Sequence, residues 1–275
     1  MRISHLHPAL FQLRVGQLRW KRRLRDRIQK VDFTRDTLET SYPHTLKRHQ
    51  SLLRRKLGES DPRLQENKVT NLAIAIATMD GLVIGPGETF SFWHRVGPPT
   101  AQKGYIEGLQ LSRGEVVTGI GGGLCQLANL LYWLALHTPL RVVERHHHSF
   151  DPFPDSHRVL PFGSGAGVFY NYVDLRFHNP TRVNHHLKLW LTDRHLKGLM
   201  TSEEEWPHSF KVHEKEHAFL RRGKKTFRTN ELWRRVIDRR TGNTVAEEFL
   251  MKNFSEVKYP VEDSLIARQD DSPQL

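Results

Sequence analysis

The sequence predicts an α+β fold, in which a helical, basic N-terminal region precedes a mainly antiparallel β-sheet core with one buried helix. Two patterns predict it. Apolar residues recur at helical spacing in residues 9–31, 66–81 and 125–137, whereas short alternating segments fill much of the chain after residue 140. With 275 residues and 37% hydrophobic content, the chain is long enough to bury a core.

Three regions follow from these patterns: a basic helical N-terminal region (1–66), a core domain (67–200), and a C-terminal β-hairpin extension with a tail (201–275). The first helix, 9–31, has an apolar stripe near heptad spacing. A second basic helix is predicted at about 44–57, ended by Gly58. The stripe consists of Leu10, Leu13, Trp20, Leu24, Ile28 and Val31.

The positive charge is concentrated in the N-terminal region. Residues 1–60 hold 15 Lys and Arg against 5 Asp and Glu, so they carry +10 of the formal +12. One interpretation is attachment of residues 1–60 to an anionic surface, either lipid headgroups or wall polymer. The alternative is a solvated basic face on a helix packed against the body. The nearly neutral remainder argues against a globally basic nucleic-acid-binding protein, and attachment of residues 1–60 to nucleic acid is a further, less favoured alternative.

Neither a signal peptide nor a membrane-spanning segment is visible in the sequence. Gln12 and Arg14 interrupt the only apolar stretch near the start, and the apolar run 130–136 is far shorter than the ~20 residues that span a bilayer. The sequence therefore predicts a cytoplasmic location. One cysteine excludes an internal disulfide.

The remaining elements alternate between helices and strands. Residues 66–81 form a core helix that ends near Gly81, and 125–137 form a helix buried on most sides that Pro139 ends. Strands are expected at 89–93, at 109–120 as strand, turn and strand, and at 140–148. Segments 172–178 and 186–192 alternate and predict a hairpin, and a second hairpin is predicted near 232–251.

The segment GGGLCQ (121–126) has the pattern of a nucleophile at a helix start. A helix N-terminus lowers a thiol pKa, and glycines leave backbone N–H groups unshielded. Cys125 is thus a candidate nucleophile, Gly122 and Gly123 are candidate oxyanion donors, and Gln126 is an auxiliary donor. The alternative is that Cys125 is a small buried hydrophobic residue at a tight turn.

A base for this thiol would come from ERHHHS (144–149). His148 is the candidate base and His146 a substrate-facing neighbour, because alternate residues of a strand share a face. The alternative is a histidine-rich surface feature. A metal site made by Cys125, His146 and His148 is disfavoured, because the spacing matches no standard motif. We therefore expect no metal and no cofactor.

At these residues the chain resembles the VanW family, which is named for an accessory protein of vancomycin-resistance clusters. The matching text is DGLVIGPGETFSFW, VGPPTAQKGY, GGGLCQLANLLYWLALHTPL and ERHHHS, collinear over about 67–178. The resemblance implies a cell-envelope protein acting on peptidoglycan or its precursors. It also implies peptidoglycan L,D-transpeptidase activity through Cys125 and His148.

The chain departs from the family pattern after the histidines. The family usually carries Gly-x-Asp-Ala there, whereas this chain has GSGAGV with Gly165 at the Asp position. Asp174 or Asn171 would then have to orient the histidine. The alternative function is that of a non-catalytic accessory protein that binds cell-wall precursor or a membrane surface.

Overall fold

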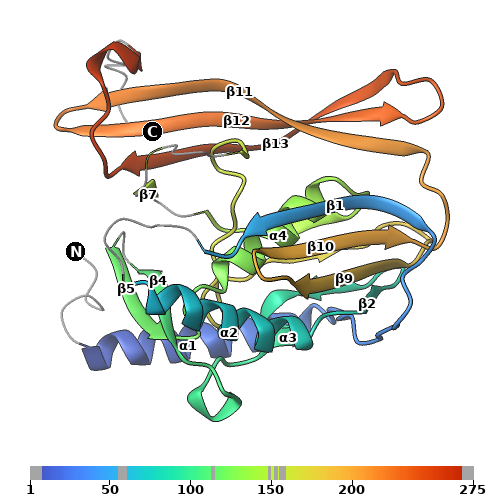
Figure 1. Ribbon diagram of the computed structural model, residues 1–275, viewed down its shortest axis with the longest axis horizontal. Coiled ribbons are helices and arrows are strands. Elements are labelled where there is room, and N and C mark those ends of the chain that lie inside the picture. The colour runs from blue at the N-terminus through green and yellow to red at the C-terminus, as the bar shows by residue number, and fades with distance from the viewer. Residues whose placement is uncertain are drawn as a thin grey trace.

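The computed structural model describes residues 8–54, 61–112, 115–147, 150–151, 154 and 159–267. Over these residues the fold is α+β with mainly antiparallel sheets, as the sequence predicts (Figure 1). The described α-helices are α1 (Pro8–Ile28), α2 (Arg63–Ala77), α3 (Phe92–Val96) and α4 (Cys125–Leu136). Two 3-10 turns add η2 (Ala101–Lys103) and η3 (Asp263–Leu265).

The strands form four sheets. A four-stranded antiparallel sheet has the order β1 (His44–Leu52), β10 (His195–Ser202), β9 (His185–Leu191) and β2 (Leu82–Ile84). A second sheet has the order β14 (Ile266–Ala267), β11 (His208–Arg222), β12 (Lys225–Asp238), β13 (Thr244–Val257) and β7 (Phe150–Asp151). Two smaller sheets pair β3 (Thr89–Ser91) with β8 (Arg176–His178) and β6 (Arg141–Glu144), and β4 (Glu107–Ser112) with β5 (Glu115–Ile120).

Helix α4 is the centre of the core, as its apolar sequence predicts. It lies between the four-stranded sheet and the long strands β11–β13 (Figure 1). Gly198 on β10 permits this close approach, since a Cβ there would lie 2.6 Å from Leu130 Cδ2. On the other side, the Tyr132 hydroxyl donates to Met251 Sδ at 3.2 Å. Arg234 donates to the carbonyls of Leu136 and Thr138, which stabilises the C-terminal end of the helix.

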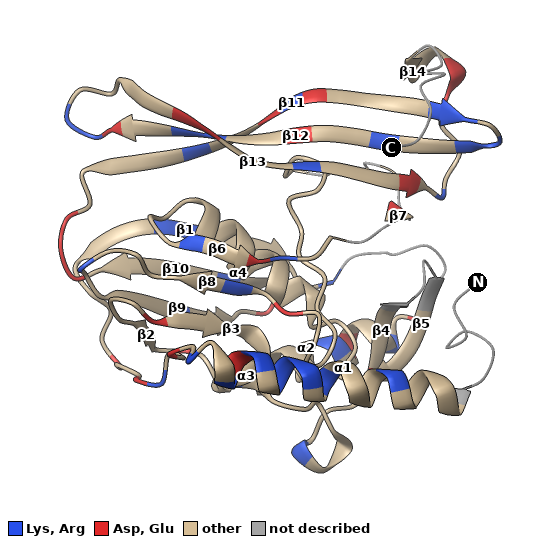
Figure 2. Ribbon diagram, turned by 180° about the vertical axis from the view of Figure 1, so that it is seen from behind, with Lys and Arg blue, Asp and Glu red and all other residues tan. Residues whose placement is uncertain are grey.

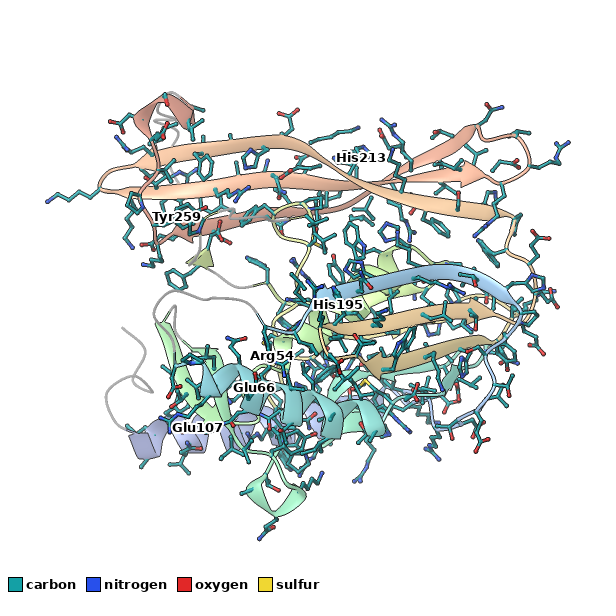
Figure 3. The ribbon with its side chains drawn as sticks, in the orientation of Figure 1. Arg54, Glu66, Glu107, His195, His213 and Tyr259 are labelled. Atoms are coloured by element: carbon teal, nitrogen blue, oxygen red, sulfur yellow. The ribbon has the colours of Figure 1, made fainter. Side chains whose placement is uncertain are left out.

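The predicted helix at 44–57 is wrong, because residues 44–52 form β1. This strand pairs antiparallel with β10, from His44 opposite Ser202 to Leu52 opposite His195. The end of β1 is tied to α2, where the Arg54 guanidinium donates to both Glu66 carboxylate oxygens at 2.5 and 2.6 Å (Figure 3). Pairing with a strand about 150 residues away outweighs a weak local helical pattern.

The predicted hairpin of 172–178 with 186–192 is also wrong. β8 pairs with β3 and β6, whereas β9 pairs with β10 and β2, so the two strands belong to different sheets. The Asn179 amide between them donates to the carbonyls of Ile84 and Val183, which holds the turn to β2. The predicted strands within 109–120 are confirmed as the antiparallel pair of β4 and β5, and the hairpin of β12 with β13 is confirmed as well.

Helix α1 packs through the face opposite to its predicted apolar stripe. Val15 is buried, and Arg19 donates to the Tyr170 carbonyl at 2.8 Å while its guanidinium lies over the Tyr170 ring. The stripe faces solvent instead, with Leu13 and Ile28 each 70% exposed. The docked face is polar because its partners on the body are carboxylates, carbonyls and an arginine.

This arrangement predicts opposite outcomes for two leucine substitutions. Leu131→Ala in α4 removes a fully buried side chain and should cost about 2–5 kcal/mol of unfolding free energy. Leu13→Ala in α1 removes an exposed side chain and should change stability by about 0.5 kcal/mol or less. Urea denaturation measures both. A large loss in Leu13→Ala would contradict the outward orientation of the stripe.

Candidate functional site

Cys125 is the first residue of α4 and follows a turn that two glycines make possible. Gly121 and Gly123 adopt φ of +77° and +91°, which other residues rarely adopt. The thiol belongs to a half-buried residue, and its sulfur accepts the backbone N–H of Val168. The segment around Val168 therefore lies directly against the start of the helix.

Burial raises the pKa of the Cys125 thiol above its ordinary value. The N–H groups of Val168 and of Cys125 itself favour the thiolate, but they only partly offset this effect. The helix start thus does not produce the lowered thiol pKa that the sequence pattern suggested. A thiol of this kind needs a base to become a nucleophile at neutral pH.

Gly122 and Gly123 are positioned beside Cys125, but their amides are already used. The Gly122 N–H donates to the Gly119 carbonyl at 3.1 Å, and the Gly123 N–H donates to the Leu109 carbonyl at 2.8 Å. Both amides are thus engaged within the chain, and their role as oxyanion donors stays a prediction. Among the backbone hydrogen bonds of the described residues, the amides of Leu124 and Cys125 have no carbonyl partner.

Gln126 connects α4 to the end of β1. Its side-chain amide donates to Ser51 Oγ at 2.9 Å and to the Leu52 carbonyl at 2.7 Å. Both donor hydrogens thus have partners within the chain, and the role of Gln126 as an auxiliary donor to a substrate stays a prediction. Its position explains why an amide side chain suits this site: it satisfies two acceptors where β1 ends.

The histidine segment and Cys125 lie on opposite sides of residues 165–168. The His146 carbonyl accepts the Gly167 N–H at 2.7 Å, and the neighbouring Val168 N–H points at the Cys125 sulfur. Asn129, one turn along α4 from Cys125, accepts the Ala166 N–H at 2.7 Å and so holds this segment in place. His148, the predicted base, lies outside the described residues.

His146 contacts a carboxylate that the sequence analysis did not single out. Its Nε2 lies 3.0 Å from Glu144 Oε1, and the His146 side chain is 44% exposed to solvent. Residues 144 and 146 are two apart on an extended chain, so the alternation of a strand could have predicted this pair. Of the two proposed substitutes for the family Asp, the Asp174 carboxylate accepts from Ser91, Trp93 and Arg176 instead of a histidine. Among the hydrogen bonds of the described residues, none joins Asn171 to His146.

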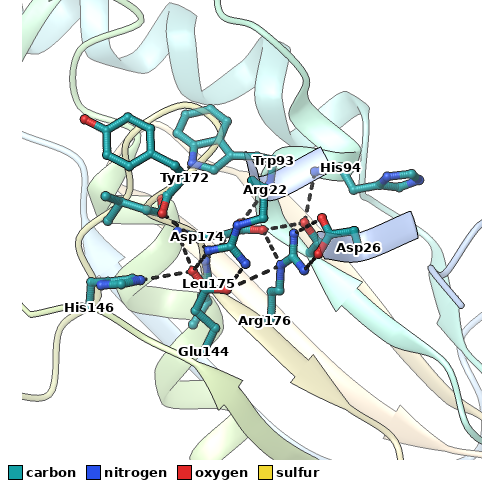
Figure 4. A network of polar contacts seen from close by, with 12 residues as sticks. Arg22, Asp26, Trp93, His94, Glu144, His146, Tyr172, Asp174, Leu175 and Arg176 are labelled. Atoms are coloured by element: carbon teal, nitrogen blue, oxygen red, sulfur yellow. Dashed lines mark hydrogen bonds and ion pairs between the residues drawn. The ribbon is translucent and has the colours of Figure 1, made fainter. Parts of the chain in front are cut away.

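Glu144 belongs to a buried network of charges that joins α1 to the core (Figure 4). Arg22 from α1 binds both Glu144 oxygens at 2.5 Å. Arg176 from β8 binds Asp174 at 2.7 Å and both oxygens of Asp26 at 2.6 and 2.8 Å. Asp174 also accepts the Ser91 hydroxyl and the Trp93 amide, so it organises the start of α3 rather than a histidine.

The network determines the protonation of its carboxylates. Burial alone would raise the pKa of Glu144, but hydrogen bonds from His146 and Arg22, with the charges of Arg22 and Arg176, lower it to about 2. Burial raises the pKa of Asp174, against the opposing effect of Arg176. Glu144 is therefore an ionised hydrogen-bond acceptor for His146 at neutral pH, and it orients that imidazole.

Comparison with known proteins identifies the family of this chain. A family model described as VanW like protein matches residues 67–201, which include Cys125, Glu144 and His146. The vancomycin B-type resistance protein VanW of Enterococcus faecalis is 31% identical over 201 residues, which cover 73% of each chain. The chain belongs to the VanW family. A second relative, the uncharacterized protein YoaR of Bacillus subtilis, is 34% identical over 109 residues, which are 40% of this chain and 34% of that protein. No solved structure matches this chain.

Two further searches of the described residues are negative. None of their helices is both long and apolar enough to cross a membrane. Among the same residues, no three His, Cys, Asp or Glu side chains gather closely enough to hold a metal ion.

The close approach of Gly122 to Gly108 predicts a structural role for this glycine. A Cβ on Gly122 would lie 2.0 Å from the Gly108 carbonyl carbon, so Gly122→Ala must displace backbone and should cost about 1–3 kcal/mol or more of stability. Gly16→Ala is the control, because nothing lies within 4 Å of its Cβ. Thermal unfolding separates the two. An unchanged melting temperature in Gly122→Ala would contradict the structural role of Gly122.

The buried pair of Arg22 and Glu144 predicts a pH dependence. Because folding lowers the pKa of Glu144 from 4.5 to about 2, its contribution to stability is present above pH 4.5 and is lost as the pH falls toward 2. Glu144→Gln should cost about 3–5 kcal/mol at pH 7, since it leaves Arg22 unpaired, and should flatten this part of the pH profile.

The exposed pair of Arg54 and Glu66 is the matched control for that measurement. Its carboxylate is also held by two guanidinium hydrogen bonds, but the side chain is largely in water. Glu66→Gln should therefore change the unfolding free energy little. Equal effects of the two substitutions would show that burial of the Arg22 pair contributes nothing.

Proposed function

We propose that this chain acts in glycopeptide resistance on peptidoglycan stem peptides, with Cys125 as an acyl-transferring thiol of the L,D-transpeptidase type. The relative from Enterococcus faecalis is named for vancomycin resistance, and its match covers most of both chains. The observation that carries the chemical part is the position of Cys125 at the start of α4, where its sulfur accepts the Val168 N–H. Work on peptidoglycan would require association with the cell envelope.

The reaction uses the thiol twice. A base takes the thiol proton, Sγ attacks a stem-peptide carbonyl carbon, and the C–N bond breaks as the leaving amine takes that proton. The resulting thioester is attacked by the amine of a second stem peptide, which loses a proton and returns the thiol. His148 is the proposed base and His146, oriented by Glu144, the neighbour that meets the substrate.

The oxyanion in this proposal is held by the helix start rather than by the glycine amides. The N–H groups of Gly122 and Gly123 donate to backbone carbonyls. Among the described residues, the N–H groups of Leu124 and Cys125 have no such carbonyl partner. An N–H at the first positions of a helix also carries the favourable end of the helix dipole. These two amides are therefore the proposed donors to the tetrahedral intermediate.

A second candidate function is that of a non-catalytic accessory protein that binds cell-wall precursor. The raised thiol pKa of Cys125 favours it, because such a thiol is mostly protonated at neutral pH. The engagement of the Gln126 amide with β1 favours it as well. In this function the site would bind a stem peptide without forming a bond to it.

One assay separates the two functions. The full chain is incubated with stem-peptide fragments and a labelled amine acceptor, and intact mass and product formation are followed. The acyl-transfer proposal expects a thioester on Cys125, with product formation reduced roughly a thousandfold or more in Cys125→Ser. His148→Ala should lower the rate by roughly 10²–10⁴.

The control is His44→Ala, which changes a histidine at the opposite end of β1 from Leu52 and should leave the rate unchanged. If wild type and Cys125→Ser bind the fragments equally and Cys125 is not acylated, the acyl-transfer proposal is wrong. The accessory function is then favoured. Melting temperatures show whether each variant is folded.

A further inference from the structure

The outward face of α1 is apolar along its length. Side chains of this face are 40–70% exposed, although each is a large hydrophobic residue. At about 100° per residue they all lie on the side of the helix opposite Val15, which is buried. They cover ~27 Å of helix. The face, here called the α1 apolar face, consists of Leu10, Leu13, Trp20, Leu24 and Ile28.

Cations border the α1 apolar face on both sides. The same helical spacing places Arg14, Lys21 and Arg25 along one edge and Arg23 and Arg27 along the other, and all five are exposed. Within the described part of the chain, none of them forms an ion pair with an acidic side chain. Figure 2 shows Lys and Arg bands along the length of α1.

The orientation of this face is determined by the opposite side of the helix. The only acidic residue of α1, Asp26, is held by Arg176, while Arg22 is held by Glu144. Arg19 is bonded to the Tyr170 carbonyl. Asp26, Arg19 and Arg22 of α1 thus bind the body of the protein. The α1 apolar face and its five bordering cations therefore face solvent.

We propose that α1 binds the surface of a bilayer that contains anionic lipids. The α1 apolar face would enter the boundary between headgroups and acyl chains, with Trp20 at headgroup level and the bordering cations on lipid phosphates. A hydrated anionic polymer would meet the cations but would offer the five apolar side chains nothing to enter. In a symmetric pairing of two copies, the same bordering cations would face each other and repel.

The test is co-sedimentation of the full chain with vesicles of phosphatidylcholine, with and without about one-third phosphatidylglycerol. Wild type should bind the anionic vesicles only, and added salt should weaken binding because it screens the cations. Arg23→Gln with Arg27→Gln should lower the partition constant about thirtyfold. Trp20→Ser with Leu24→Ser should lower it at least about tenfold.

Matched controls change equally exposed residues elsewhere. Val245→Ser with Leu265→Ser, and Lys224→Gln with Arg240→Gln, should bind as wild type does, as should Cys125→Ser, because lipid binding does not depend on the thiol chemistry. Circular dichroism confirms the fold of each variant. Absence of binding, or full binding by the Trp20 and Leu24 variant, would overturn the proposal. A wild-type dimer that this variant dissociates would assign the face to a second copy instead.

Discussion

The contact of Arg22 with Glu144 is the interaction on which the arrangement of this protein depends. A charge removed from water is stable only when it is paired and hydrogen-bonded, and here two arginines meet three carboxylates in a largely buried space. The network joins α1 to β6 and β8 and reaches the start of α3 through Asp174. An N-terminal helix that looks like a separate basic arm is thereby part of the core structure.

The same carboxylate connects two regions of different character. Glu144 receives Arg22 on one side and His146 on the other, so the docking of α1 and the orientation of an imidazole near the candidate site share one acceptor. Glu144 is thus one direct connection between the docking of α1 and the histidine segment.

Around Cys125, most polar groups are already engaged in hydrogen bonds within the chain. The glycine turn uses its amides to close on β4 and β5, Gln126 satisfies the end of β1, and Asn129 holds residues 165–168 over the helix start. What remains is a thiol with a raised pKa beside the amides of Leu124 and Cys125, which have no carbonyl partner among the described residues. The chemistry of such a site depends on the base that approaches the thiol.

The sequence by itself determined the features that local periodicity encodes. Helices α1, α2 and α4, the hairpin of β12 with β13, the α+β class and the family all follow from spacing and motif. Only the tertiary structure decided which face of α1 is buried, that residues 44–52 are a strand, and that β8 and β9 enter different sheets. The reason is that these outcomes depend on partners far along the chain: β10 for β1, Glu144 for Arg22, and Arg176 for Asp26. A short segment with little intrinsic preference takes the conformation that satisfies its distant partners. The local sequence of the segment does not specify which partners these are.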